Sequence, residues 1–156
     1  MRTPLLFIAV MLVCLATTEA RLFACSCAPP VSTCVAAGQA RAIFVGQVVD
    51  ITILKPGAPS DAPSGLPISR RVSFKVTETL RGTLDDTVVV FTGPGGGECG
   101  YEFSNGKSYL VYAHQETTGQ LTTNRCGRTR QATSGAAGEI KELRGLSVEP
   151  RKCVQY

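Results

Sequence analysis

The residues best suited to chemistry are two closely spaced cysteines in the run Cys25-Ser26-Cys27-Ala28-Pro29-Pro30. This run follows a segment that is typical of a cleavable leader. If cleavage falls between Ala24 and Cys25, the mature chain begins with a cysteine whose α-amine is free. That amine and the carbonyl oxygen of the same residue can bind one metal ion together in a five-membered ring. An N-terminus anchored by disulfides in this way could enter the zinc site of another protein.

Residues 1–24 have the pattern of a secretory signal peptide. Arg2 supplies a positive charge, and Leu5 to Ala16 is an apolar run of suitable length. The run is too short for an ordinary membrane span, which needs about 20 apolar residues. Two cleavage sites compete, one after Ala24 and one after Ala20. We expect cleavage after Ala24, a secreted and extracellular protein, and no membrane span in the mature chain.

Residues 25–156 have the length of one domain and a mildly basic charge. The chain has 16 Lys and Arg against 12 Asp and Glu. Residues 1–24 contain two of the former and one of the latter, which leaves 14 against 11, a net charge of +3. The basic clusters at Arg70-Arg71 and 125–130 are not interleaved with the stacking aromatic residues of a nucleic-acid interface. We expect no nucleic-acid partner and a monomeric protein.

The number of cysteines predicts a disulfide framework. Seven are encoded, and Cys14 belongs to the leader. The remaining six are Cys25, Cys27, Cys34, Cys99, Cys126 and Cys153. An even number in a secreted chain favours disulfides, although spacing alone leaves the connectivity open. A zinc site made of thiolates is disfavoured, because the sequence has no Cys-x-x-Cys pair and no cysteine–histidine spacing of the usual kind.

Most of the remaining pattern indicates β structure. Runs rich in β-branched or alternating residues predict five strands, at 41–54, 72–77, 87–92, 107–114 and 121–125. Gly46 predicts a bulge in the first of them. The Pro- and Gly-rich stretch 55–67 predicts a loop. Short helices are expected at 32–40 and 136–146. Five strands with a short helix near each end predict a mainly β fold, a five-stranded closed barrel of the OB type.

Two stretches of the sequence resemble a known family. The opening Cys25-Ser26-Cys27-Ala28-Pro29-Pro30 resembles the N-terminus of the tissue inhibitors of metalloproteinases, which begin Cys-x-Cys-x-Pro. The stretch Glu98-Cys99-Gly100-Tyr101 resembles the region around that family's fourth cysteine, with the glutamate displaced toward the cysteine. Weaker matches are 109–113, 119–126 and the closing helix before Cys153. The resemblance implies that residues 25–156 form an OB-like barrel, also called a netrin-like domain.

The resemblance also implies a set of disulfides and a binding site. The implied disulfides are Cys25–Cys99, Cys27–Cys126 and Cys34–Cys153. The amine and carbonyl of Cys25 would displace the water on the catalytic zinc of a metalloproteinase, and Ser26 would point toward the primary specificity pocket. The other implied contact residues are Cys27, Ala28 and Pro29 along the substrate cleft and Glu98 and Cys99 beside them. The protein would be an inhibitor and not an enzyme, with no cofactor of its own, since the protease supplies the zinc.

The sequence departs from the vertebrate members of the family in three places. Six residues separate Cys27 from Cys34, fewer than is usual. The sequence ends three residues after Cys153, so we expect no second domain. The stretch 55–67 is rich in proline and glycine where some members carry a long hairpin. Which metalloproteinases are bound is therefore left open.

Two other classes of function stay open. Cleavage after Ala20, or acylation of Cys25, would block the amine and leave a netrin-like module that binds a protein without inhibiting it. A barrel of the OB type could also bind an oligonucleotide or oligosaccharide, although few aromatic residues and a modest charge weaken that case. No motif organises serines or carboxylates for catalysis, and we expect the single histidine, His114, to pack in or on a strand.

Overall fold

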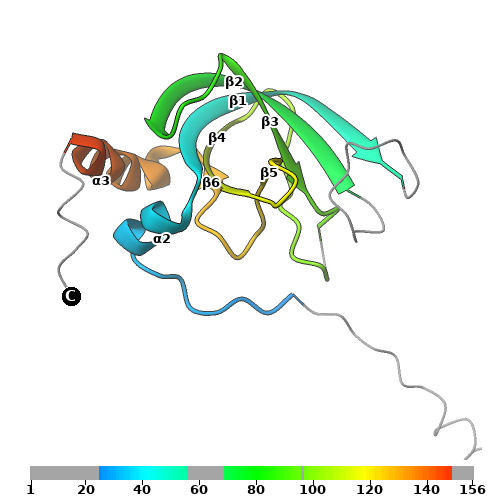
Figure 1. Ribbon diagram of the computed structural model, residues 1–156, viewed down its shortest axis with the longest axis horizontal. Helices are drawn as coiled ribbons and strands as arrows, with labels where there is room; N and C mark the ends of the chain where they lie inside the picture. Colours follow the sequence, from blue (N-terminus) through cyan, green and yellow to red (C-terminus); the bar gives the residue numbers. More distant parts are fainter. Residues whose placement is uncertain (1–24, 56–68, 96, 149–156) are drawn as a thin grey trace, which may run out of the picture.

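The computed structural model describes residues 25–55, 69–95 and 97–148 of the chain. Its elements are α2 (Thr33–Gln39), β1 (Ala42–Leu54), β2 (Ser69–Arg81), β3 (Thr87–Thr92), β4 (Ser108–Gln115), β5 (Leu121–Thr122), β6 (Arg130–Gln131), the 3₁₀ turn η1 (Ser134–Ala136) and α3 (Ala137–Val148) (Figure 1). The predicted leader, most of the predicted loop 55–67 and Cys153 lie outside the described residues.

The strands form one sheet that returns on itself. Its order is β1-β2-β3-β5-β4-β6, and an additional pairing of β1 with β4 completes a ring of five strands. Neighbours in the ring are antiparallel except β3 and β5, which meet in parallel at Phe91 and Thr122. The mainly β character and the helix near each end of the described chain are confirmed.

The longest pairing joins β1 to β2. The register runs from Ile43 opposite Arg81 to Leu54 opposite Ser69, with shifts that include one between Val45 and Gly46. The predicted irregularity at Gly46 is confirmed. A Cβ there would lie 3.0 Å from the ring of Phe44, so only glycine fits without displacing that ring. β2 is longer than the predicted 72–77, because β1 provides hydrogen-bond partners along the polar ends of the strand as well.

One prediction near the end of the sheet is wrong, and one strand was missed. β5 covers two residues and not 121–125, and β6 was not predicted. The cause lies in two threonine side chains. Thr123 donates its hydroxyl to the carbonyl of Tyr112 at 2.9 Å, and Thr129 accepts from the amide of Tyr112 at 3.0 Å. These side chains take the place of a neighbouring strand's backbone, so the chain between β5 and β6 leaves the ladder.

The ring separates two apolar clusters. The inner one contains the aromatic side chains Phe44, Phe74, Phe103 and Tyr109, which meet mainly edge to face. The outer one lies between the helices and the opposite face of β1 and β4, and its members are Ala36, Ala37, Ala40, Ile43, Leu80, Leu110, Tyr112 and Leu143. Both predicted helices are present. They cover this outer face, where α2 and α3 lie against each other (Figure 1).

Helix α2 begins as the sequence predicts. Ser32 caps it, accepting the amide of Val35 on its hydroxyl at 3.3 Å. No helix of the described residues is long and apolar enough to cross a membrane.

Candidate functional site

Two disulfides tie the start of the described chain to distant loops. Cys25 is bonded to Cys99, 74 residues away, and Cys27 to Cys126, 99 residues away. The Cα atoms are 5.0 Å apart in the first bridge and 5.1 Å in the second. These are the pairs that the resemblance implies. Cys34 is also disulfide-bonded, and its implied partner Cys153 lies outside the described residues.

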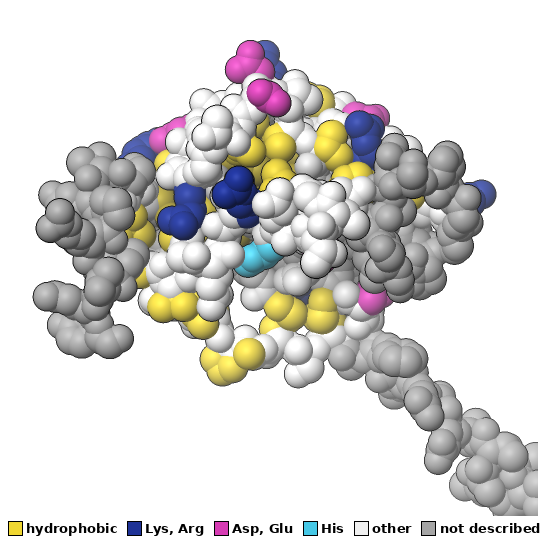
Figure 2. Space-filling view, viewed as in Figure 1, with side chains coloured by type: hydrophobic (Ala, Val, Ile, Leu, Met, Phe, Trp, Pro, Cys, Tyr) yellow, Lys and Arg dark blue, Asp and Glu magenta, His cyan; other side chains and the backbone are white. Residues whose placement is uncertain are grey.

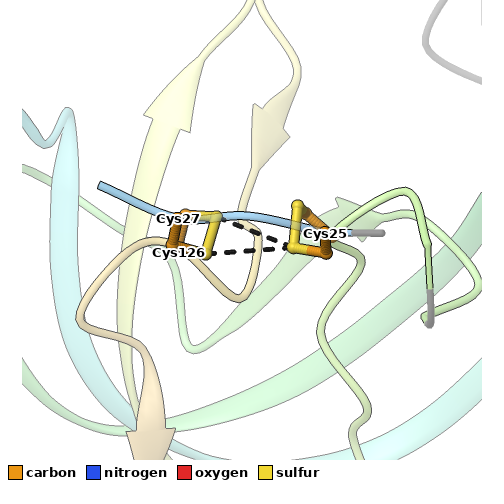
Figure 3. Close-up of side chains that lie close together, drawn as sticks. Cys25, Cys27 and Cys126 are labelled. Atoms are coloured by element: carbon orange, nitrogen blue, oxygen red, sulfur yellow. Dashed lines mark hydrogen bonds between the residues drawn. A yellow bond between two sulfur atoms is a disulfide. The ribbon is translucent and has the colours of Figure 1, made fainter. Parts of the chain in front are cut away.

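The two bridges lie against each other. Sγ of Cys25 is 3.8 Å from Sγ of Cys27 and 3.8 Å from Sγ of Cys126, the contacts dashed in Figure 3. All four sulfur atoms, including that of Cys99, lie within 4.8 Å of one another, as the ligands of a metal ion could. Each of them is in a disulfide, however, and a disulfide sulfur is not the thiolate that binds zinc. With both disulfides formed, the four cysteines cross-link the start of the described chain to two loops.

The residues that the resemblance implies for the site lie on two segments, which the Cys25–Cys99 bridge joins. Cys25 and Cys99 are half-buried, whereas Ser26, between the two bridges, is exposed. The other exposed members are Cys27, Ala28, Pro29 and Glu98. We call residues 25–29 together with Glu98 and Cys99 the ridge. Its polypeptide is fixed by covalent bonds while its side chains remain accessible to a partner.

The loop that carries Cys99 is tightly folded. Cys99 has a positive φ of 62°, the left-handed conformation that costs a non-glycine residue about 1 kcal/mol or more. Its carbonyl accepts the amide of Arg125 at 2.8 Å, and Tyr101 donates its amide to the hydroxyl of Thr92 at 2.8 Å. A Cβ on Gly100 would overlap the backbone of Gly93, which explains the glycine after the cysteine.

The other anchoring loop is shaped by one asparagine. Oδ1 of Asn124 accepts the amides of Cys126 and Gly127, both at 3.0 Å. This is the side-chain turn typical of asparagine, and it presents Cys126 toward Cys27. Asn124 was not singled out from the sequence, although an asparagine two residues before a bridging cysteine is a recognisable turn signal.

A surface pocket of about 390 Å³ lies beside the ridge. Its lining includes Glu98 of the ridge, Glu116, and the ends of β3 and β5. Glu116 accepts the hydroxyl of Thr122 at 3.1 Å. The pocket therefore offers carboxylates and hydroxyls to whatever docks on the ridge. No lysine or arginine is among its described lining residues.

His114 occupies the strand position that the sequence predicts. It is half-buried in β4, opposite Thr122 of β5. It lines a second pocket of about 280 Å³, between β4 and the chain from Ala28 to Val31. Figure 2 shows the chain's single histidine on this face, with basic side chains above it and hydrophobic side chains below.

A buried ionic cluster next to the ridge was not predicted from the sequence. Oε1 of Glu139 accepts Nε of Arg128 at 2.5 Å and the hydroxyl of Tyr112 at 2.8 Å. Its Oε2 is 3.2 Å from Nη2 of Arg130. Burial and the hydrogen bond to Glu139 raise the pKa of Tyr112, so its hydroxyl stays a donor. The sequence did contain one signal for this cluster. Glu139 lies one turn before Leu143 on the apolar face of α3, and a carboxylate buried on such a face needs a cation beside it.

The comparisons with known proteins add no identification. Neither the model of a known protein family nor a curated protein sequence matches this chain.

Proposed function

We propose that this protein is a secreted inhibitor of zinc metalloproteinases, and that its ring of strands is the closed, OB-like barrel of a netrin-like domain. The observation that carries the proposal is the ridge. Two adjoining disulfides hold Cys25 and Cys27 in place, and Ser26 to Pro29 are exposed beside them. A fixed and exposed segment that begins with a free amine is suited to binding a metal ion held by another protein.

The zinc chemistry follows from the open position of a protease's metal. A catalytic zinc has three protein ligands and a fourth position occupied by water. After cleavage before Cys25, its amine nitrogen and carbonyl oxygen replace that water as a chelate. No covalent bond in either protein is made or broken. The inhibitor blocks the site because the displaced water is the nucleophile that the protease needs.

The remaining ridge residues extend the contact on both sides of the zinc. The side chain of Ser26 enters the primary specificity pocket, and Cys27, Ala28 and Pro29 continue along the substrate cleft. Glu98 and Cys99 form the other half of the contact. Because the disulfides hold these segments before docking, little conformational entropy is lost on binding, and more of the interaction energy appears as affinity.

The test is a panel of zinc proteases assayed with protein whose N-terminus has been verified by intact mass. We expect at least one to be inhibited. An α-amine has a pKa of about 7.7–8.0 and binds metal only when neutral, so binding releases its proton. The inhibition constant should therefore rise as the pH falls below neutrality. Constants that do not change with pH would argue against ligation by the amine.

A netrin-like binding module without inhibitory activity is the second candidate. The observation that favours it is the competing cleavage site after Ala20. Residues 21–24 would then precede Cys25 and convert its amine into an amide, which does not bind zinc in this way. The same intact-mass measurement separates the two candidates, because the two mature proteins differ by four residues.

A further inference from the structure

The chain that leads from the end of the ridge into helix α2 makes few polar contacts with the rest of the described structure. Residues 28–31 belong to no helix or strand. Pro29 and Pro30 have no amide hydrogen to donate. Within the described chain, Nη1 of Arg128 donates a hydrogen bond to the carbonyl of Val31, at 2.8 Å. One side chain from a distant loop therefore supplies a polar contact that holds this stretch.

Apolar packing adds little to this hold, because residues 28–31 are exposed and belong to neither apolar cluster of the described chain. The pocket of about 280 Å³ lies between it and β4, with Tyr112 and His114 on its far side. Residues 28–31 thus pass over this pocket and not over a packed surface. Val31 itself is 43% exposed, so it keeps a large part of its apolar surface in contact with water. The direction of the segment has to come from its two ends and from Arg128.

Arg128 is itself held firmly. Its Nε donates to Glu139 of α3 at 2.5 Å, and the Glu139 side chain is only 6% exposed. The Arg128 side chain is 19% exposed. A guanidinium is planar and has several N–H groups in a fixed arrangement, so it can bind a carboxylate and a carbonyl at the same time. Glu139 is anchored in turn by the hydroxyl of Tyr112.

We propose that Arg128 is a positioning residue of the ridge. Its guanidinium joins the carbonyl of Val31 to Glu139 of α3, and this link sets the direction in which the chain leaves the Cys27–Cys126 bridge. The loop at 126–128 holds the N-terminal segment at two points four residues apart, covalently at Cys27 and by a hydrogen bond at Val31. Helix α3 thereby supports the ridge through Arg128. The consequence for inhibition rests on the proposed function; the structural role does not.

The protein offers a matched control for this role. Arg128 and Arg130 are both cations on Glu139, and of the two it is Arg128 that also donates to Val31. Arg128→Ala and Arg130→Ala each remove one of the two cations beside the Glu139 carboxylate. Only Arg128→Ala also removes the hydrogen bond to the carbonyl of Val31. Arg128→Lys keeps the charge, yet a single ammonium group cannot reproduce the two-sided contact.

The first measurement is ¹⁵N relaxation of the Ala28 and Val31 amides in the whole mature protein. Rigid backbone gives an order parameter of about 0.85, and flexible backbone gives less than about 0.6. We expect wild type and Arg130→Ala to be rigid, Arg128→Ala to be flexible, and Arg128→Lys to lie between them. The proposal is overturned if Arg128→Ala stays rigid, or if Arg130→Ala becomes equally flexible. Should Arg128→Ala not fold, Arg128→Lys decides: rigidity equal to wild type overturns the proposal.

The second measurement uses a zinc protease that the wild-type protein inhibits. Without the hydrogen bond from Arg128 to Val31, the segment has to be ordered when it docks, so Arg128→Ala should raise the inhibition constant by about tenfold. Arg130→Ala should leave it nearly unchanged. Equal effects of the two variants would overturn the proposal. If the wild-type protein inhibits no zinc protease, the proposed function fails, and the relaxation data still decide the role of Arg128.

Discussion

The ridge and the helical side of the molecule are held together in different ways. On the helical side, Leu143 of α3 and Ile43 of β1 are almost fully buried in the outer apolar cluster. At the ridge, Ser26 to Pro29 are exposed and belong to neither apolar cluster of the described chain. Disulfides and single hydrogen bonds hold the backbone there. A surface that must stay accessible to a partner cannot bury its own side chains, so its rigidity has to come from cross-links.

Removing one bridge should have the largest effect on stability and tests whether cross-links hold the ridge side of the molecule. We expect the double variant Cys27→Ala/Cys126→Ala to lower the free energy of unfolding by about 4 kcal/mol, because a bridge across a long loop restricts the unfolded chain most. Denaturant titration with circular dichroism measures the change. The bridge spans 99 residues, and a loss below about 1 kcal/mol would show that it contributes little to holding the fold.

A substitution on the helical side should lower the stability of the fold without weakening inhibition. Leu143 is 2% exposed, and Leu143→Ala should cost about 3 kcal/mol through lost burial and the cavity that remains. Inhibition by the folded fraction should be unchanged, since the link from α3 to the ridge runs through Glu139 and Arg128 and does not involve the Leu143 side chain. Lys141→Ala, at an exposed position of the same helix, is the control and should stay within about 0.5 kcal/mol. A weaker inhibition constant for Leu143→Ala would mean that apolar packing beneath α3 also supports the ridge.

Ser26→Gly should have the opposite effect, weakening inhibition while leaving the stability of the fold nearly unchanged. It removes the group that we assign to the specificity pocket and touches neither bridge, so the free energy of unfolding should change by less than about 1 kcal/mol. The inhibition constant of a susceptible protease should rise by about tenfold, or about 1.4 kcal/mol. Steady-state inhibition assays give this value. An unchanged constant would remove Ser26 from its assigned role.

The smallest expected effect concerns an exposed ion pair far from the ridge. Arg144 of α3 donates to Glu78 of β2 at 2.6 Å, and this hydrogen bond lowers the pKa of Glu78. A lowered pKa means that the pair stabilises the fold above the usual pKa of glutamate. That stability is lost as the pH falls through the pKa of the folded state.

Arg144→Gln should therefore lower the melting temperature slightly at neutral pH, and the difference from wild type should shrink in acid. Because the Arg144 side chain is 59% exposed, solvent screening keeps the contribution of the pair small. Calorimetry at several pH values measures it. A difference that grows on acidification would contradict the expected sign.

Much of the sheet could be predicted from local pattern, whereas contacts between distant residues could not. β1, β3, β4 and α2 match their predicted ranges closely, because alternation, β-branched runs and the Ser32 cap are local signals. The chain after β5 was predicted wrongly because Thr123 and Thr129 bond to Tyr112, eleven and seventeen residues away.

The site shows the same division. The resemblance at 25–30 and at 98–101 implied that these two segments are joined, and the Cys25–Cys99 bridge joins them. The link from Val31 through Arg128 to Glu139 joins three parts of the chain, with a sequence separation of 97 between the first two partners. No periodicity or motif encodes such a pairing. Only the folded ring brings these groups together.

One added residue tests the central claim most directly. Placing an alanine before Cys25 converts the amine into an amide while leaving both bridges and every ridge side chain in place. We predict that this extended protein folds normally but no longer inhibits the zinc protease that the mature protein blocks. Equal inhibition by the extended and the mature forms would contradict ligation of the zinc by the Cys25 amine.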